Sequence, residues 1–138
     1  MSDNASIAVP IPQPDRDTAP YWQALAEGRL VLQRCADCRR WTWPARPICS
    51  GCYGFDLTWE DAAGTGEVYS WIVTYQPYSA ALAAIVPYVV ALVRVDEQDD
   101  ILIPGRFASD AEIHQGMKVR MATEKASDDI GILDWVPA

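Results

Sequence analysis

Four cysteines restrict the fold of this chain more than any other feature of its sequence. They form two C-x-x-C pairs, Cys35 with Cys38 and Cys49 with Cys52, and residues 39–48 connect the pairs. Each pair makes a turn that presents two thiolates, and two such turns close a tetrahedron of sulfur atoms around one metal ion. Four protein ligands leave no open coordination position, so we expect the metal to be structural and not hydrolytic. The spacing therefore predicts a zinc ribbon with Zn²⁺ bound by all four thiolates.

Two other states of these cysteines stay open at the level of sequence: a pair of disulfides, and a bound iron as in rubredoxin. The first ten residues contain no basic segment followed by an apolar run, so no secretory signal is visible. Disulfides are rare in proteins that stay in reducing compartments. We therefore expect a cytoplasmic protein and favour zinc, which would contribute on the order of 10 kcal/mol to the folding of so small a ribbon.

The charge and the apolar segments argue against two other classes of function. The formal net charge is -8, and nucleic-acid binding depends on Lys and Arg that neutralise phosphates, so we expect no nucleic-acid partner. The longest apolar stretch, Ala80–Val93, is interrupted by Pro87 and is too short to cross a bilayer. We therefore expect no membrane span.

Composition and turn residues divide the chain into four segments. The start of the chain is rich in Pro and Asp and has no hydrophobic period. Asp17 or Thr18 is suited to cap a following helix, and Gly28 is suited to end it. We expect, in order, a disordered or extended arm (1–17), a helix (18–29), the zinc ribbon (30–62) and an OB-fold (63–138).

Five strand-like segments recur in the last part of the chain. Asp96–Asp100 and Gly116 supply turns between them, and Ala111–Gln115 is expected to form a helical turn. Five short strands in so few residues are typical of a small closed barrel such as an OB-fold, so the predicted fold class is mostly β. The strands are expected at about 66–75, 86–95, 100–107, 117–123 and 130–136.

The segment between Pro77 and Pro87 fits neither period. Its Ala and Leu residues favour a short helix, and it otherwise reads as a long apolar loop inserted between the first two barrel strands. Such a loop is either ordinary core or a protein interface, and the sequence leaves both open. The loop residues that would form the interface are Tyr78, Leu82, Ile85 and Val86, and the first barrel strand is a further candidate.

Aromatic and basic residues surround the cysteines. The aromatic cluster comprises Trp41, Trp43, Tyr53, Phe55 and Trp59, and packing between the ribbon and its neighbours explains it better than stacking on bases. Trp41 and Trp43 are also candidate partner contacts. The arginines either face the phosphates of a nucleotide-bearing cofactor or pair with the chain's own acids, which is the commoner outcome at a surface. They are Arg29, Arg34, Arg39, Arg40 and Arg46.

Candidate catalytic residues are missing from the sequence. The single histidine, His114, falls in an expected loop, and no cysteine remains as a nucleophile if all four bind metal. We find no Gly-rich phosphate loop, no H-E-x-x-H and no G-x-S-x-G motif. We therefore predict no catalytic residues and a protein that is not an enzyme by itself.

The order of these features resembles the DUF35 family, in which a rubredoxin-like zinc ribbon precedes an OB-fold associated with acyl-CoA metabolism. The resemblance rests on an aromatic helix that runs through Glu27–Leu32 directly into the cysteine pairs, and on three later segments. It covers about residues 20–136. The three segments are Gly64–Trp71, Pro87–Val93 and Gly116–Val119.

What the resemblance implies is a partner. Members of the family assemble with thiolase-fold enzymes, including lipid-transfer-protein-like thiolases and retro-aldolases, and some with MaoC-like hydratases in steroid side-chain breakdown. The expectation is a non-catalytic subunit in a hetero-oligomer that binds and stabilises an acyl-CoA aldolase or thiolase in steroid or lipid catabolism. Arg39 and Arg40 are then candidates for contacts to CoA phosphates. The alternatives are a partner of a MaoC-like enoyl-CoA hydratase, a CoA-binding channelling module and, less favoured, a nucleic-acid-binding protein.

Overall fold

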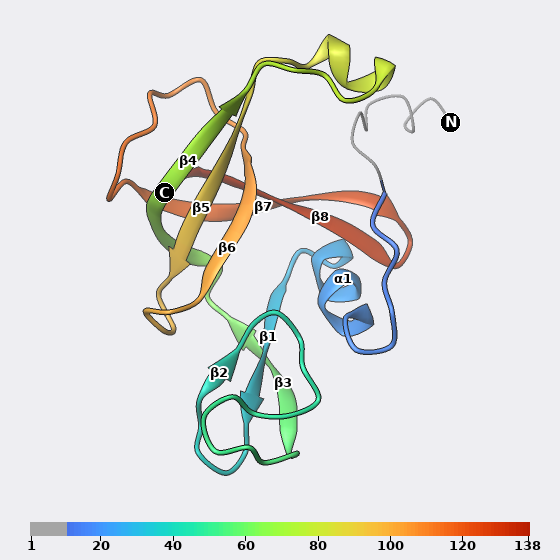
Figure 1. Cartoon of the computed structure of the whole chain (residues 1–138), viewed down its shortest axis with the longest axis vertical. Coiled ribbons are helices and arrows are strands. Elements are labelled where there is room, and N and C mark those ends of the chain that lie inside the picture. Colours follow the sequence, from blue (N-terminus) through green and yellow to red (C-terminus); the bar gives the residue numbers. More distant parts are fainter. Residues whose placement is uncertain (1–10) are drawn as a thin grey trace.

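A computed structural model describes residues 11–138 of the chain. Of the arm expected over residues 1–17, residues 1–10 lie outside the described residues, and residues 11–15 have no regular secondary structure. The chain continues into a short helix, a three-stranded sheet and a closed five-stranded barrel (Figure 1).

The helix and strands keep one numbering along the chain. Helix α1 is Ala19–Ala26. The strands are β1 Leu30–Cys35, β2 Trp41–Thr42, β3 Leu57–Ala62, β4 Thr65–Thr74, β5 Tyr88–Val95, β6 Leu102–Phe107, β7 Lys118–Ser127 and β8 Ile130–Pro137, with a 3-10 helix, Ala80–Ala84, between β4 and β5.

Two reciprocal hydrogen bonds precede helix α1. Thr18 N–H donates to Asp15 Oδ1 over 2.8 Å, and Asp15 N–H donates to Thr18 Oγ1 over 3.1 Å. The bond from Thr18 N–H is the main reason that the pKa of the Asp15 carboxyl is lowered. Thr18 is the N-cap residue, one of the two expected, although its hydroxyl accepts from Asp15 N–H and makes no bond to the helix. Gly28 follows the helix with φ of 80°, a conformation that favours glycine.

Strand β8 lies so close to helix α1 that one strand position has no room for a side chain. A Cβ atom on Gly131 would lie 2.2 Å from the carbonyl carbon of Leu25 and 2.3 Å from the amide nitrogen of Ala26. Leu25 and Tyr21 on the same helix are buried in the main core, and burial raises the pKa of the Tyr21 hydroxyl. The close approach therefore holds the helix against the barrel.

The ribbon sheet has β1 at its centre, with β2 and β3 antiparallel on either side. Leu30 and Leu32 of β1 are fully buried, and they belong to the same hydrophobic cluster as Val93 of β5 and Trp135 of β8. One core therefore extends from the ribbon sheet into the barrel, and a small ribbon need not supply a core of its own.

The barrel has the strand order β4-β5-β6-β8-β7 and closes where β7 returns to β4. The closing pairs join Thr65–Glu67 to residues 118–120. Strands β6 and β8 are parallel and every other pair in the barrel is antiparallel, which is the arrangement of an OB-fold. Each of the five predicted strands overlaps one barrel strand, and the predicted fold class is confirmed.

The helical turn expected over Ala111–Gln115 is not formed, and residues 111–114 have no helical structure. The end of this loop is instead bonded to β4, because Gly116 N–H donates to Val68 O (2.8 Å) and Val68 N–H donates to Met117 O (2.9 Å). Ile113 and Met117 also pack on the core. These long-range contacts hold the loop in place of the local bonds of a helix.

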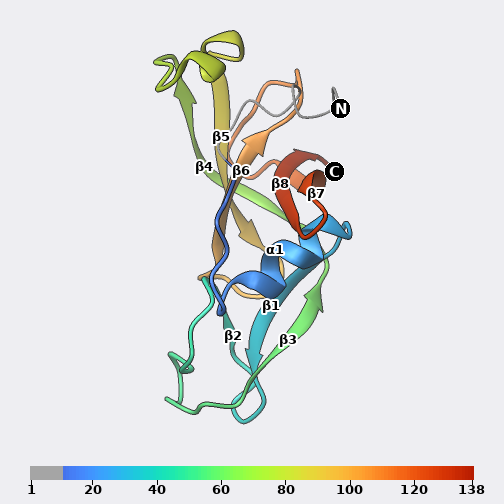
Figure 2. The same cartoon turned by 90° about the vertical axis from the view of Figure 1, so that its right-hand side faces the viewer.

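Strands β4 and β5 extend as a long hairpin beyond the rest of the barrel. The 3-10 helix Ala80–Ala84 lies at its tip, so the helical expectation for the segment between Pro77 and Pro87 was right in part. Figures 1 and 2 place this tip and the zinc-ribbon sheet at opposite ends of an elongated molecule. The hairpin is therefore the part of the fold that is most removed from the ribbon.

The contact at Gly131 makes a stability prediction. Gly131→Ala should lower the free energy of unfolding by about 1–3 kcal/mol, since the added methyl group meets helix backbone that cannot rotate away. Urea denaturation followed by tryptophan fluorescence measures this loss. Lys125→Ala is the control, because Lys125 is paired with Gly131 across the ladder but has an exposed side chain; it should change the value by less than about 0.5 kcal/mol. Equal stabilities for the two variants would contradict the packing argument.

Candidate functional site

Four sulfur atoms come together at the far end of the ribbon sheet. The Sγ atoms of the four cysteines all lie within 4.8 Å of one another. The Cys35–Cys52 and Cys38–Cys49 sulfur pairs are 3.6 Å and 3.5 Å apart. Tetrahedral zinc–sulfur bonds of about 2.3 Å would place the sulfurs about 3.8 Å apart, so the set fits a single metal ion. The cysteines are not disulfide-bonded, because a disulfide would require about 2.05 Å, and the disulfide alternative was wrong.

The two cysteine turns share one backbone pattern. Cys35 N–H donates to Arg40 O and Arg39 N–H donates to Cys35 O, each over 2.9 Å. In the second turn the same bonds join Cys49 to Gly54 (2.9 Å) and Tyr53 to Cys49 (3.0 Å). The residue after each pair, Arg39 or Tyr53, has a positive φ of 66° or 63°, which an L-residue adopts only when the surrounding structure requires it. Local geometry therefore orients both pairs of sulfurs toward one point.

The backbone also prepares one sulfur as a thiolate. The N–H groups of Cys52 and Gly51 lower the pKa of the Cys49 thiol to about 6, because a hydrogen bond to a sulfur favours its charged form. Gly51 has a second role, since a Cβ atom there would lie 2.8 Å from Arg40 Cδ and 3.7 Å from the Cys38 and Cys49 sulfurs. These bonds favour the Cys49 thiolate, which is the form of cysteine that binds metal.

The four-cysteine site makes a prediction about the metal content of the protein. The purified protein should contain one zinc per chain by elemental analysis, and Cys49→Ser should lose it, because an uncharged hydroxyl is a poor replacement for a thiolate. Hydrogen exchange should then show lost protection in β1–β3 and retained protection in β7 and β8. Ser50→Ala, next to the ligand but not part of the set, should keep the metal. Stoichiometric iron in the wild type, or zinc retained at full affinity by Cys49→Ser, would contradict this account.

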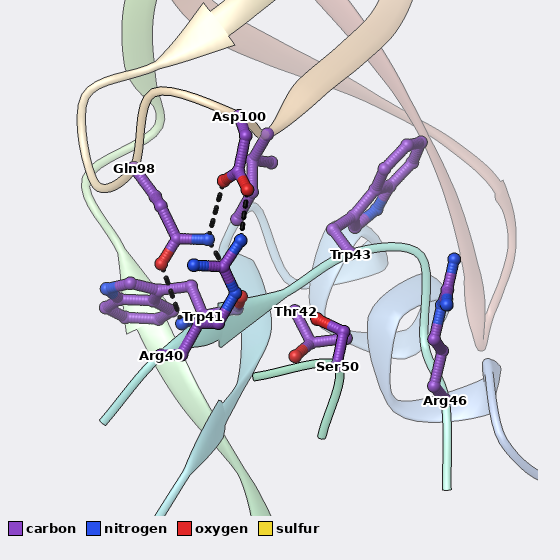
Figure 3. Close-up of a pocket in the computed structure, with 9 residues that line it drawn as sticks. Arg40, Trp41, Thr42, Trp43, Arg46, Ser50, Gln98 and Asp100 are labelled. Atoms are coloured by element: carbon purple, nitrogen blue, oxygen red, sulfur yellow. Dashed lines mark hydrogen bonds and ion pairs between the residues drawn. The ribbon is translucent and has the colours of Figure 1, made fainter. Parts of the chain in front are cut away.

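A polar contact joins the ribbon to the barrel next to these cysteines (Figure 3). Trp41 N–H donates to Gln98 Oε1 and Gln98 Nε2 donates to Trp41 O, both over 3.0 Å. Gln98 Nε2 also donates to Asp100 Oδ1 (2.8 Å), and Asp100 pairs with Arg40. The amide of Gln98 therefore pairs with β2 as a neighbouring strand would and fixes the β5–β6 turn against the ribbon.

A small cavity of about 180 Å³ lies beside this contact. The Thr42 hydroxyl at its wall is buried and has no hydrogen-bond partner within the described residues. Figure 3 shows Arg40 turned toward Asp100 and Arg46 apart from them. The lining residues are Arg40, Trp41, Thr42, Trp43, Arg46, Ser50, Gln98, Asp100 and Ile101.

The ribbon arginines lie close to the chain's own acids. Arg40 pairs with Asp100, while Arg34 (3.5 Å) and Arg39 (3.3 Å) both reach Glu60. Arg29 likewise pairs with Glu27 (2.8 Å) and Asp61 (2.6 Å). Within residues 11–138, Arg46 makes no side-chain ion pair, and it contributes a backbone N–H to Gln33 Oε1 (2.7 Å). A phosphate that approached Arg39 or Arg40 would therefore compete with carboxylates that already occupy them.

The amide contact at Gln98 gives a second stability prediction. Gln98→Ala should lower the free energy of unfolding by about 1–2 kcal/mol, because it removes two hydrogen bonds to half-buried backbone groups of Trp41. Thermal unfolding by circular dichroism measures the loss. Asp99→Ala, at the exposed neighbouring position of the same turn, is the control and should change stability by less than about 0.5 kcal/mol. If both variants unfold at the same temperature as the wild type, the Gln98 contact does not hold the ribbon and the barrel together.

The residues expected to bind a partner differ in how far the structure exposes them. Trp41 is buried beneath Arg34, whose guanidinium lies 4.6 Å from the ring centroid. Trp43 is half-buried and packs near Tyr21, with ring centroids 6.3 Å apart. At the hairpin tip Leu82 is only 6% exposed and Tyr78 is 80% exposed, while Ile85 and Val86 are half-buried. Of this set, Tyr78 presents the largest exposed aromatic surface.

The first barrel strand, expected as a candidate interface, is β4, and it carries a group of exposed apolar side chains that the sequence did not single out. Residues 69–73 are all exposed, although a barrel strand ordinarily buries every second side chain. One signal was available: residues 68–93 contain no Asp, Glu, Lys, Arg or His. The large apolar residues exposed on or after β4 are Tyr69, Trp71, Ile72, Val73, Tyr75 and Tyr78.

Two further expectations concern catalysis and membranes. His114 is exposed, and its Nδ1 lies 3.2 Å from the carbonyl oxygen of its neighbour Gln115. Among residues 11–138, no helix is both long and apolar enough to cross a membrane.

Two family models match consecutive parts of the chain. Residues 22–58 match the model described as the rubredoxin-like zinc ribbon domain of ChsH2, and residues 59–124 match the model of the C-terminal OB-fold domain of ChsH2. The boundary between the two matches falls within β3, just before the barrel begins.

Three curated relatives share substantial identity with the chain. A Pyrococcus furiosus protein named as a DUF35 domain-containing scaffold protein is 31% identical, over 76% of each chain. A Thermomonospora curvata protein named as a probable enoyl-CoA hydratase alpha subunit is 37% identical over 94% of this chain. A Mycobacterium tuberculosis protein named as a 3-oxo-4,17-pregnadiene-20-carboxyl-CoA hydratase alpha subunit is 31% identical over 91%. The chain spans only 36% and 39% of the lengths of these two hydratase-named relatives.

Two solved structures share the fold. A chain of a structure described as the Ltp2-ChsH2(DUF35) aldolase is 36% identical with a TM-score of 0.80, covering 91% of this chain and 98% of that chain. A Sulfolobus solfataricus DUF35 protein of unknown function is 16% identical with a TM-score of 0.64, covering 89% of this chain and 86% of that one. The second likeness shows the fold alone.

Proposed function

Because the chain belongs to the DUF35 family, as a ChsH2-type zinc-ribbon and OB-fold protein, we propose that it is a non-catalytic subunit of an acyl-CoA aldolase or thiolase. It would bind and stabilise a thiolase-fold, lipid-transfer-protein-like enzyme that supplies the reacting groups. The substrates would be acyl-CoA thioesters of steroid side-chain or lipid catabolism. The protein would act in the cytoplasm as part of a hetero-oligomer.

One observation carries this proposal. The chain of the Ltp2-ChsH2(DUF35) aldolase structure is covered over 98% of its length at 36% identity. The likeness therefore extends over the ribbon and the barrel of that chain together. A protein that keeps both parts keeps the whole unit described as part of an aldolase.

The site geometry is compatible with a supporting role. The four cysteine sulfurs fit a closed tetrahedral metal site, and such a site offers no coordination position for a substrate. We propose that zinc occupies it and fixes the ribbon in shape. The ribbon in turn is fastened to the barrel through Gln98 and Asp100. A rigid two-part body of this kind is suited to hold a partner enzyme in one orientation.

A second candidate partner is a MaoC-like enoyl-CoA hydratase. The relatives named as hydratase alpha subunits support it, because this chain matches only about a third of their lengths. The remaining length in those proteins would hold the hydratase. In this chain the corresponding role would be to bridge a separate hydratase to the aldolase.

Direct contact with CoA is a finer proposal within the same function. Arg40, which lines the cavity beside the Gln98 contact, and its neighbour Arg39 would approach the CoA phosphates, exchanging Asp100 and Glu60 for phosphate oxygens. A nucleic-acid partner is less favoured, since the ribbon arginines lie against acids in a chain with a net charge of -8. Calorimetry with CoA on the wild type and on the Arg39→Ala/Arg40→Ala double variant, with Arg29→Ala as control, separates a phosphate contact from none.

The main proposal predicts that the partner enzyme binds this chain and is more stable when bound to it. Co-expression with the Ltp2 enzyme should yield a co-purifying complex, and the enzyme should unfold at a higher temperature in the complex than alone, since a bound partner stabilises the folded state. The isolated chain should show no turnover of acyl-CoA substrates. A purified chain that cleaves an acyl-CoA unaided, or an Ltp2 enzyme that neither binds it nor gains stability, would overturn the proposal.

A further inference from the structure

The hairpin formed by β4, the 3-10 helix and β5 differs in charge from the rest of the chain. Residues 68–93 contain no ionisable Asp, Glu, Lys, Arg or His, whereas the whole sequence has 11 Lys and Arg and 19 Asp and Glu. From here on, residues 69–90 of this hairpin are called the arm; the name no longer refers to residues 1–17. Because natural proteins usually place charges on exposed strands, an exposed arm without charge calls for a physical reason.

Apolar side chains cover both faces of the arm. Cross-strand partners share a face, and Trp71 is paired with Ala91, a fully buried core residue. Val73, which is 40% exposed, lies on that core-side face beyond the end of the barrel. Ile72 lies on the opposite face and is 62% exposed. The arm therefore continues the barrel core outward on one side and carries an apolar residue on the other.

One edge of the arm is also unpaired among residues 11–138. Strand β7 pairs with β4 only at Thr65–Glu67, and the loop before β7 bonds to Val68. The register shifts at Tyr69, and from Ser70 to Thr74 strand β4 pairs with β5 alone within the described residues. Along these residues alternate N–H and C=O groups point away from β5 and have no strand to bond to.

These observations indicate what kind of partner would bind the arm. A strand added beside Ser70–Thr74 would satisfy the free backbone groups, and its flanking surface would cover both apolar faces. Charge complementarity requires that surface to be uncharged, because charges buried against the arm would lose hydration without gaining a counter-charge. The arm fits an edge strand of a protein with an apolar surface on either side.

Two other occupants fit less well. An anionic membrane would be repelled by a protein with a net charge of -8, and the arm has no Lys or Arg to bind lipid headgroups. A second copy could pair edge to edge, but it would bring together two bodies of the same net charge. The uncharged surface of a different protein avoids both costs.

We propose that the free edge of β4 at Ser70–Thr74, with Trp71, Ile72 and Val73, is the surface on which the lipid-transfer-protein-like enzyme docks by adding a strand. This inference rests on the proposed function and names the interface within it. Of the segments expected at the interface, it keeps the first barrel strand and sets aside two other expected residues, because Leu82 is turned inward and Trp41 is buried by Arg34. The body of the arm, and not its tip or the ribbon tryptophans, makes the main contact.

A binding experiment with matched variants tests the proposal. Ile72→Lys and Val73→Lys each place a charge on one face of the arm, and Phe55→Lys places the same charge on a ribbon aromatic that is 78% exposed. All three positions are exposed, so the variants should fold, which circular dichroism checks. Calorimetric titration with the Ltp2 enzyme should give a Kd at least about tenfold weaker for each arm variant, and within about twofold of wild type for Phe55→Lys.

Hydrogen exchange tests the mode of docking in the wild-type complex. Amides within residues 70–74 should exchange more slowly when the Ltp2 enzyme is bound, because half of them gain strand hydrogen bonds. Protection confined to residues 80–86 or to the ribbon would overturn strand addition at this edge.

The outcomes separate the two proposals. Wild-type binding that is unchanged in both arm variants overturns the docking surface and leaves the proposed function standing, whereas no wild-type binding overturns both. A wild-type dimer, seen by analytical ultracentrifugation and lost in Ile72→Lys, would assign the edge to a second copy instead. Co-sedimentation with phosphatidylcholine vesicles that Val73→Lys abolishes would assign it to a membrane.

Discussion

The four cysteine sulfurs, held within 4.8 Å of one another, set the geometry on which the ribbon and its connection to the barrel depend. Between β2 and β3 the chain runs without regular structure through residues 43–56, and most of its side chains are exposed. Packing alone does not hold such a segment, so the convergence of its cysteines on one point, with a metal ion bound there as proposed, would define it. Because β2 follows the first cysteine turn directly, the positions of the sulfurs also determine where Trp41 meets Gln98.

The charged residues around the cysteines serve the fold in this structure. Arg34 and Arg39 converge on Glu60 of β3, and Arg40 reaches across to Asp100 of the barrel. Exposed ion pairs contribute little to stability, so their main effect is on orientation. The two pairs with Glu60 lie within the ribbon, whereas the Arg40–Asp100 pair and the Gln98 amide together orient the ribbon against the barrel.

The cysteine frame and the barrel could be predicted because their signals are local. The C-x-x-C spacing determines ligand identity, and alternating apolar residues with turns mark each strand. The bonding in front of the helix and the loop 111–115 could not be predicted in the same way. Thr18 bonds to Asp15, which lies outside the expected helix, and the loop is held by Val68, which lies far away in sequence. Burial of Leu82 and Trp41 likewise depends on neighbours that only the folded chain brings together.

Predicting the exposed apolar surface on β4 requires knowing which neighbouring strands are absent. A period-2 pattern places every second residue in a core, but here the neighbouring strands end before the hairpin does, so both faces of residues 70–74 stay uncovered. No local rule reveals that a partner strand is missing. The absence of charge across residues 68–93 can be read from the sequence alone, and it gains its meaning only beside the topology. A free, uncharged edge is a site where chains aggregate unless something covers it. The fold places this edge on a hairpin that extends from the barrel at the end opposite the ribbon, where a bound protein would lie far from the four cysteines.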